Sequence, residues 1–66
     1  MINISEVLQS KNFIKTYKVY GYNGKFIDKY LLDETGTLRS VSDGEIMEER
    51  FQLWDIVNIF KFEECQ

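Results

Sequence analysis

The side chains of this chain that could catalyse a reaction are not grouped by their spacing. The 66 residues include no histidine and one cysteine, Cys65. Catalysis needs a base or nucleophile with a partner that activates it, and Cys65 lies next to a terminus, where chains are usually frayed. The adjacent carboxylates Glu48-Glu49 and Glu63-Glu64 point apart on a helix or a strand. A single cysteine without histidine also cannot build the usual zinc site. We therefore expect no enzyme, no cofactor and no metal.

Two tyrosines lie between lysines in residues 18–29 and suggest binding chemistry. If Asn23-Gly24 is a two-residue loop, one face of the hairpin points outward with six residues: Lys18, Tyr20, Tyr22, Lys25, Ile27 and Lys29. Tyrosine rings stack on bases and lysines neutralise phosphates. Four residues are therefore candidate binding residues for a nucleotide-type molecule: Lys18, Tyr20, Tyr22 and Lys29. The same pattern is typical of a solvated sheet face, or of one covered by a neighbouring subunit. The net charge of −3 argues against duplex nucleic acid.

The charge is divided unevenly along the chain. In residues 1–29, five lysines and two acids give +3, whereas in residues 30–66 three basic residues and nine acids give −6. Acidic residues gather around 43–49, most often a sign of a solvated helix face, but such a patch also fits a basic cleft on a partner. Trp54 follows, which we expect in the core or at a subunit interface. The candidate partner-binding residues are Glu45, Glu48, Glu49 and Trp54.

The N-terminal half predicts a short helix and a β-hairpin. Residues 4–10 are expected to be helical, capped by Asn3 or Ser5, with apolar residues at 4, 7 and 8 on one face. Residues 13–22 and 25–32 are rich in aromatic and β-branched types and predict two strands. Asn23-Gly24 accepts the positive φ angles of a type I′ turn, so 13–32 is a hairpin. Its inner face would bury six residues: Phe13, Tyr17, Val19, Phe26, Tyr30 and Leu32.

The same turn fixes the expected register of the hairpin. Counting back from the turn, Tyr22 pairs with Lys25, Tyr20 with Ile27, and Lys18 with Lys29. Directly opposed like charges destabilise a sheet, so either this register is wrong or an anion relieves the repulsion between the two lysines.

The C-terminal half predicts further strands and a second helix. Residues 33–36 form a turn, 37–41 a third strand, and 43–49 a short helix in which Ser42 and Glu45 match a capping box. Segment 51–62 favours a strand with a bend near Asp55, although residues 46, 53, 57 and 60 also line one face of a long helix. We predict an α+β domain spanning 1–66, with strands near 37–41 and 51–62 completing a small antiparallel sheet.

The size and composition favour a cytoplasmic protein that self-associates. With 44% hydrophobic residues the chain can collapse, but below about 70–80 residues a core is marginal without a disulfide, a metal or a partner chain. The first two are not expected, so a homo-oligomer is. No apolar run reaches the ~18–20 residues that span a membrane, and a lone thiol suits the cytoplasm.

Two stretches resemble a known family. Residues 4–9 followed by Phe13-Ile14-Lys15 resemble an opening helix that leads into a basic first strand. Residues 42–53, from Ser42 through Phe51-Gln52-Leu53, resemble a pattern of serine, acid, two aliphatics, acids, then aromatic-acid-aliphatic. Both are similar to small phage proteins related to the second Thoeris anti-defence family, whose members sequester cyclic ADP-ribose-type signals at subunit interfaces. That family usually has a basic-aromatic pair closing the first strand, where this chain has Lys15-Thr16-Tyr17, and a tryptophan at the position of Phe51.

Two functions therefore fit the sequence. The first is a non-enzymatic, phage-type inhibitor that binds and blocks a host or defence protein in the host cytoplasm. The alternative is an oligomeric sponge for a nucleotide-type signal such as a cyclic ADP-ribose derivative, which is what the resemblance implies. The first would depend on the acidic residues and Trp54, and the second on the lysine-tyrosine face.

Overall fold

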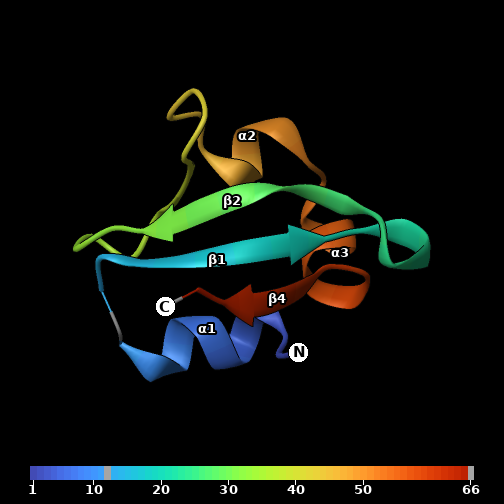
Figure 1. Ribbon diagram of the computed structural model, residues 1–66, viewed down its shortest axis with the longest axis horizontal. Coiled ribbons are helices and arrows are strands. Elements are labelled where there is room, and N and C mark those ends of the chain that lie inside the picture. The colour runs from blue at the N-terminus through green and yellow to red at the C-terminus, as the bar shows by residue number, and fades with distance from the viewer. Residues whose placement is uncertain (12, 66) are drawn as a thin grey trace.

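A four-stranded antiparallel sheet with helices on one side forms the molecule (Figure 1). The computed structural model describes residues 1–11 and 13–65. The elements are α1 (Ile4–Ser10), β1 (Lys15–Tyr20), a 3-10 turn (Tyr22–Gly24), β2 (Phe26–Leu32), β3 (Leu38–Ser40), α2 (Met47–Arg50), α3 (Leu53–Asn58) and β4 (Lys61–Glu64). The strand order is β3-β2-β1-β4. The predicted α+β arrangement with a small antiparallel sheet is confirmed.

Helix α1 begins as the sequence predicts, with Asn3 as its cap. The Asn3 side chain accepts from the Glu6 backbone N–H at 3.0 Å, and the Glu6 carboxylate accepts from the Asn3 backbone N–H at 3.4 Å. This reciprocal pair satisfies two donors that the first helical turn leaves free. Of the predicted apolar face, Val7 is buried and Ile4 half-buried, but Leu8 is exposed. Helix α1 therefore packs against the core mainly through Val7, with a smaller contribution from Ile4.

The register of the hairpin is confirmed in its middle and wrong at its turn. Lys18 lies opposite Lys29 as predicted. Asn23 and Gly24 have the expected positive φ angles, 58° and 70°. The Lys25 N–H also donates to the Tyr22 carbonyl at 3.0 Å, as the predicted turn requires, but the Lys25 carbonyl accepts from the Gly21 N–H at 2.8 Å and not from Tyr22. The loop is therefore longer than two residues, and Tyr22 does not pair with Lys25 as a ladder residue.

A β-bulge in β2 accounts for the shifted register. Tyr20 pairs with Phe26 rather than with Ile27, so Ile27 is an extra residue, and such a residue bends the strand and re-aims side chains. Ile27 packs against the core, and Phe26 is turned outward with 49% of its surface exposed. Gly21 permits this, because a Cβ there would lie 2.8 Å from Ile27 Cδ1. The prediction that Ile27 points outward and Phe26 inward is wrong.

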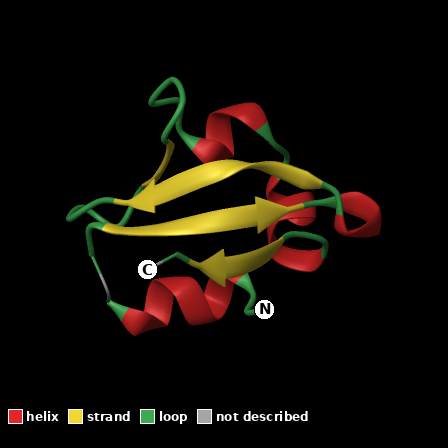
Figure 2. Cartoon of the chain, viewed as in Figure 1, coloured by secondary structure: helices red, strands yellow, loops and turns green. Residues whose placement is uncertain are grey.

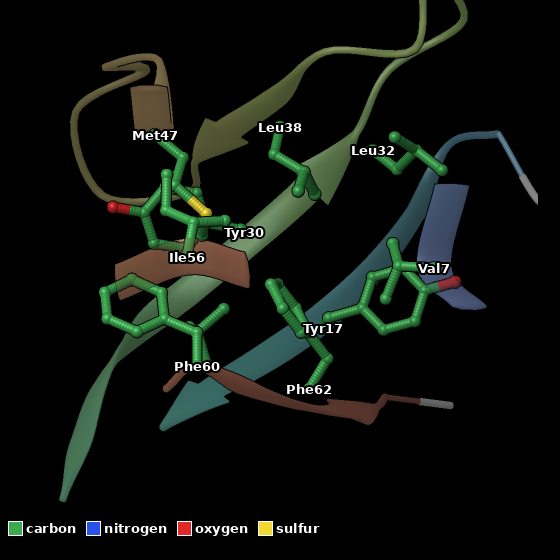
Figure 3. Close-up of a cluster of buried hydrophobic side chains, with 10 residues drawn as sticks. Val7, Tyr17, Tyr30, Leu32, Leu38, Met47, Ile56, Phe60 and Phe62 are labelled. Atoms are coloured by element: carbon green, nitrogen blue, oxygen red, sulfur yellow. The ribbon is translucent and has the colours of Figure 1, made fainter. Parts of the chain in front are cut away.

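The core lies between the sheet and the three helices, as Figure 3 shows. Each helix contributes one fully buried side chain, Val7 from α1, Met47 from α2 and Ile56 from α3. The strands and the residue before β4 supply the others: Tyr17, Val19, Tyr30, Leu32, Leu38, Phe60 and Phe62. Four of the six core residues predicted in the hairpin are buried, whereas Phe13 and Phe26 are exposed.

The segment before α2 does not form the predicted capping box. Helix α2 begins at Met47 rather than near residue 43, with Ile46 at its cap position and no side-chain cap bond. The Ser42 hydroxyl instead donates to Asp28 at 2.6 Å. This bond links the β3–α2 loop to β2 and leaves Ser42 unavailable to a helix.

The prediction of a strand over 51–62 is wrong for most of that segment. Residues Leu53–Asn58 form α3, and the strand begins only at Lys61. The alternative of one long helix is also wrong, because α2 ends at Arg50 and α3 at Asn58, so Phe60 lies outside both helices. The proposed apolar face is not formed: Phe60 is buried, but Leu53 and Val57 are exposed. Only Ile56 anchors α3 in the core.

The sheet has one covered and one uncovered face, with no helix on the near side in Figure 2. Side chains alternate along a strand, so the residues between the core positions point away from the helices. We call these the uncovered sheet face: Thr16, Lys18, Tyr20, Phe26, Lys29, Leu31, Arg39, Lys61 and Glu63.

Candidate functional site

Helix α3 presents apolar side chains to solvent. Leu53, Trp54 and Val57 are 68%, 62% and 50% exposed, and we call these three residues the α3 surface. They stand at i, i+1 and i+4 and so share one side of the helix, whereas Ile56 faces the core. Trp54 was expected in the core or at a subunit interface, and it is not in the core. Large exposed apolar groups that gather together mark interaction sites.

The predicted acidic residues lie directly before this surface in the chain. Glu45, Glu48 and Glu49 are all exposed. Helix α2 buries Met47, so its two glutamates stand clear of the core. Among the described residues none of the three forms an ion pair. The segment from Glu45 to Val57 therefore carries both sets of predicted partner-binding residues, charged and apolar.

Asp55 fixes the hairpin loop against α3. Its carboxylate accepts from the Tyr22 hydroxyl at 2.8 Å. This hydrogen bond to Asp55 is the main cause that raises the pKa of Tyr22. Beneath the two side chains lies a cavity of about 230 Å³, whose apolar lining comes from Ile27, Phe51 and Phe60. Tyr22 thus lies with Lys25 at this cavity beside α3, and not with Lys18 and Lys29, with which the sequence grouped it.

The other three predicted ligand-binding residues do come together, on the uncovered sheet face. Lys18 and Lys29 are directly opposed, and neither forms an ion pair with a described residue. The Tyr20 ring packs edge-on against Phe26 at 5.7 Å, and its hydroxyl donates to Glu63 at 3.3 Å. Tyr20 is therefore held in place at the end of this face.

An open groove of about 750 Å³ begins at the same face, near the start of β1. Phe13, Ile14 and Val41 supply its apolar lining and Thr16 and Cys65 its polar atoms. Of the two lysines that line it, Lys15 is ion-paired with Glu64. Lys29 is left as the cation that a ligand in this groove could meet.

Sequence reasoning missed a polar cluster around Asp28. The Asp28 carboxylate accepts from the hydroxyls of Ser40, at 2.9 Å, and Ser42, at 2.6 Å. The bond from Ser42 is the main cause that lowers the pKa of Asp28, against the opposing effect of burial. The cluster therefore links β2 to β3 and to the β3–α2 loop through side-chain hydrogen bonds. The partners are 12 and 14 residues away, and no local pattern marks them.

Neither a metal cluster nor a membrane-spanning helix is present among the described residues. Within residues 1–11 and 13–65, no group of three or more acidic, cysteine or histidine side chains is arranged to hold a metal ion. In the same residues, no helix has the length and apolar character needed to cross a membrane.

Comparison with known proteins adds no relative, since no protein-family model, no curated protein and no solved structure matches this chain.

Proposed function

We propose that this protein is a non-enzymatic, phage-type inhibitor that binds and blocks a host or defence protein in the cytoplasm of the host cell. The observation that carries the proposal is the exposed Trp54, which stands with Leu53 and Val57 on the α3 surface. Tryptophan is enriched among the few residues that supply most of the energy of an interface. Because Trp54 is exposed to water in the free protein, a partner that covers it buries a large apolar side chain, which favours binding.

The acidic residues support a basic target. Glu45, Glu48 and Glu49 are exposed next to the α3 surface in the chain, and among the described residues no cation pairs with them. Charges at the rim of an interface accelerate association more than they slow dissociation, and salt screens them over about 8 Å at physiological ionic strength. The partner that fits is a protein with an apolar pocket bordered by lysine or arginine.

Affinity capture tests the proposal. The protein is immobilised and exposed to a lysate of its natural host, alongside Trp54→Ala and the double variant Lys18→Glu/Lys29→Glu. We expect one protein to bind the parent and the lysine variant and to be lost with Trp54→Ala. Retention by Trp54→Ala at full strength would contradict the proposal.

A second candidate function is a sponge for a nucleotide-type signal, such as a cyclic ADP-ribose derivative. The opposed Lys18 and Lys29 favour it, because two ammonium groups without a counter-charge among the described residues offer a place for phosphates. Tyr20 and the groove beside Lys29 would contact the rest of the ligand.

Two sets of charge reversals separate the candidates. If the protein blocks a protein target, Glu45→Lys/Glu48→Lys/Glu49→Lys slows association with the target, and Lys18→Glu/Lys29→Glu changes it little. A sponge gives the opposite order when the free signal molecule is measured. Circular dichroism must show that both variants are folded, and loss of activity in the lysine variant alone would contradict our leading proposal.

A further inference from the structure

We propose that the uncovered sheet face pairs with the same face of a second copy of this chain, around a two-fold axis parallel to β1. In this dimer Lys29 of each copy lies against Glu63 of the other. The inference concerns self-association and does not depend on the proposed target.

The first argument is the apolar content of the face. Phe26 is half exposed, Tyr20 and Leu31 are partly exposed, and Val41, next to Lys29, is exposed. On a sheet of which the other side is packed by α1, α2 and α3, these residues have no cover from the described helices (Figure 1). Two such faces pack at about 10 Å as the layers of a β-sandwich.

The second argument is the charge pattern across the strands. Lys18 pairs with Glu63 on β4 and with Lys29 on β2. One row across the face therefore reads Glu63, Lys18, Lys29. A two-fold axis along β1 places β2 of one copy over β4 of the other. The row of one copy then lies over the same row of the second copy in the opposite order, so that Lys29 faces Glu63 at two places.

The alternative axis, perpendicular to the strands, is disfavoured by the same row. It places β2 over β2 and β4 over β4, so at no position along the strands does it bring Lys29 to Glu63, and where it passes through this row it brings Lys29 to Lys29 and Glu63 to Glu63. With the axis along β1, Lys18 is the one charged residue of this row that approaches its own copy, and its flexible stem lets the ammonium group turn towards Glu63, its cross-strand neighbour.

The neighbouring row agrees with this choice of axis. Tyr20 pairs with Lys61 on β4 and with Phe26 on β2. The same rotation brings Lys61 over the Phe26 ring of the second copy, where an ammonium group is attracted to an aromatic face. Tyr20, next to the axis, meets Tyr20 of the second copy.

The size of the molecule sets an upper limit on the area that the dimer can bury. The chain exposes 4423 Å² in total, and the two larger dimensions of the molecule are 29 and 23 Å. The sheet face lies within that outline, and specific interfaces use roughly 600–1,000 Å² per partner. Covering it would also supply burial that a chain of this size lacks alone.

A charge-swap experiment tests the inference without a target. Analytical ultracentrifugation compares the parent protein with Lys29→Glu, with Glu63→Lys and with an equimolar mixture of the two variants. Each variant alone opposes like charges twice in the dimer and should weaken association roughly tenfold or more. In a mixed dimer one contact joins the two substituted side chains and the other joins the two original ones, so opposite charges meet at both. The mixture should therefore restore the dimer, as should the double variant Lys29→Glu/Glu63→Lys.

Glu48→Lys on α2 is the matched control and should dimerise like the parent. A parent protein that stays monomeric at about 100 μM overturns the inference. A dimer that both single variants leave intact also overturns it, as does a mixture that fails to pair. If either single variant is unfolded by circular dichroism, the double variant decides: failure to dimerise overturns the inference. A dimer lost in Trp54→Ala but unaffected by the swaps would use the α3 surface and overturns it as well.

Discussion

Lys18 and Lys29 lie directly opposite each other on β1 and β2, at positions of the uncovered sheet face. Glu63, the nearest acid in the same row, accepts a hydrogen bond from Tyr20 instead of forming an ion pair with Lys18. The two ammonium groups therefore repel each other in the isolated chain.

Removing one of the two charges should stabilise the monomer. We expect Lys29→Gln to raise the free energy of unfolding by about 0.2–1 kcal/mol, because opposed like charges destabilise a cross-strand pair. Urea denaturation at a concentration where the protein is monomeric measures this, and added salt should reduce the gain. Lys25→Gln in the hairpin loop is the control. A less stable Lys29→Gln monomer would show that the lysines do not repel.

The Asp33 turn should make stability depend on pH in the acid range. Its carboxylate accepts from the Thr35 hydroxyl at 2.5 Å, from the Thr35 and Thr37 backbone N–H groups and from Arg39. These bonds, led by that of the Thr35 hydroxyl, lower the pKa of Asp33 from 3.8 to about 2. The stabilisation is complete above the unfolded pKa and is lost as the pH falls from about 4 towards 2.

Asp33→Asn should therefore unfold more readily at neutral pH and show a flatter decline of stability between about pH 4 and 2. Thermal unfolding across this range measures the effect. Glu34→Gln removes the neighbouring charge and is the control. An Asp33→Asn curve parallel to that of the parent would contradict the assignment.

Removing either of two buried tyrosine hydroxyls should not destabilise the protein. Within the described residues the hydroxyls of Tyr17 and Tyr30 have no hydrogen-bond partner, and burial is the main cause that raises the pKa of Tyr30. Tyr30→Phe removes a buried polar group that has no described partner, so it should leave the stability unchanged or raise it by up to about 1 kcal/mol. Tyr22→Phe, which loses the bond to Asp55, should lower it. A clear loss of stability in Tyr30→Phe would reveal a bound water or another partner.

The cap of α1 can be tested with two neighbouring polar residues. Asn3→Ala removes the side-chain oxygen that caps the helix and should cost about 1 kcal/mol. Ser5→Ala removes only a bond from the Gln9 side chain and should cost much less. Chemical denaturation of the two variants side by side measures the difference. Equal losses would mean that Asn3 does not hold the helix.

Local chemistry predicted those parts of the fold that are decided within a few residues. The Asn3 cap and the positive φ angles of Asn23 and Gly24 need only their neighbours, and both are found. Ile27 shows where that logic stops. A two-residue turn would leave Ile27 in solvent, whereas the longer loop with a bulge packs it against the core, and the sequence near the turn contains no sign of that contact.

The sequence predicted only part of the candidate site, because some of its contacts join residues that are far apart in the chain. Ser42 has the spacing of a helix cap, but Asp28, 14 residues earlier, binds its hydroxyl. Tyr22 alternates with Lys18 and Tyr20 as a strand residue should, but the loop carries it to Asp55. In segment 51–62 the residue types favoured a strand. The helical spacing of α3 could not be recognised, because three of its apolar residues are exposed and do not repeat with the period of a core-facing helix side.

The most direct test of the central claim is acrylamide quenching of Trp54 fluorescence, free and in complex with the protein captured from the host lysate. Trp54 is the single tryptophan of the chain. If the tryptophans of the partner are replaced, the fluorescence of the complex therefore reports on Trp54 alone. We predict efficient quenching in the free protein, since Trp54 is 62% exposed, and strong protection in the complex. Quenching that is unchanged in a complex of established stoichiometry would contradict the claim that the α3 surface is the site of binding.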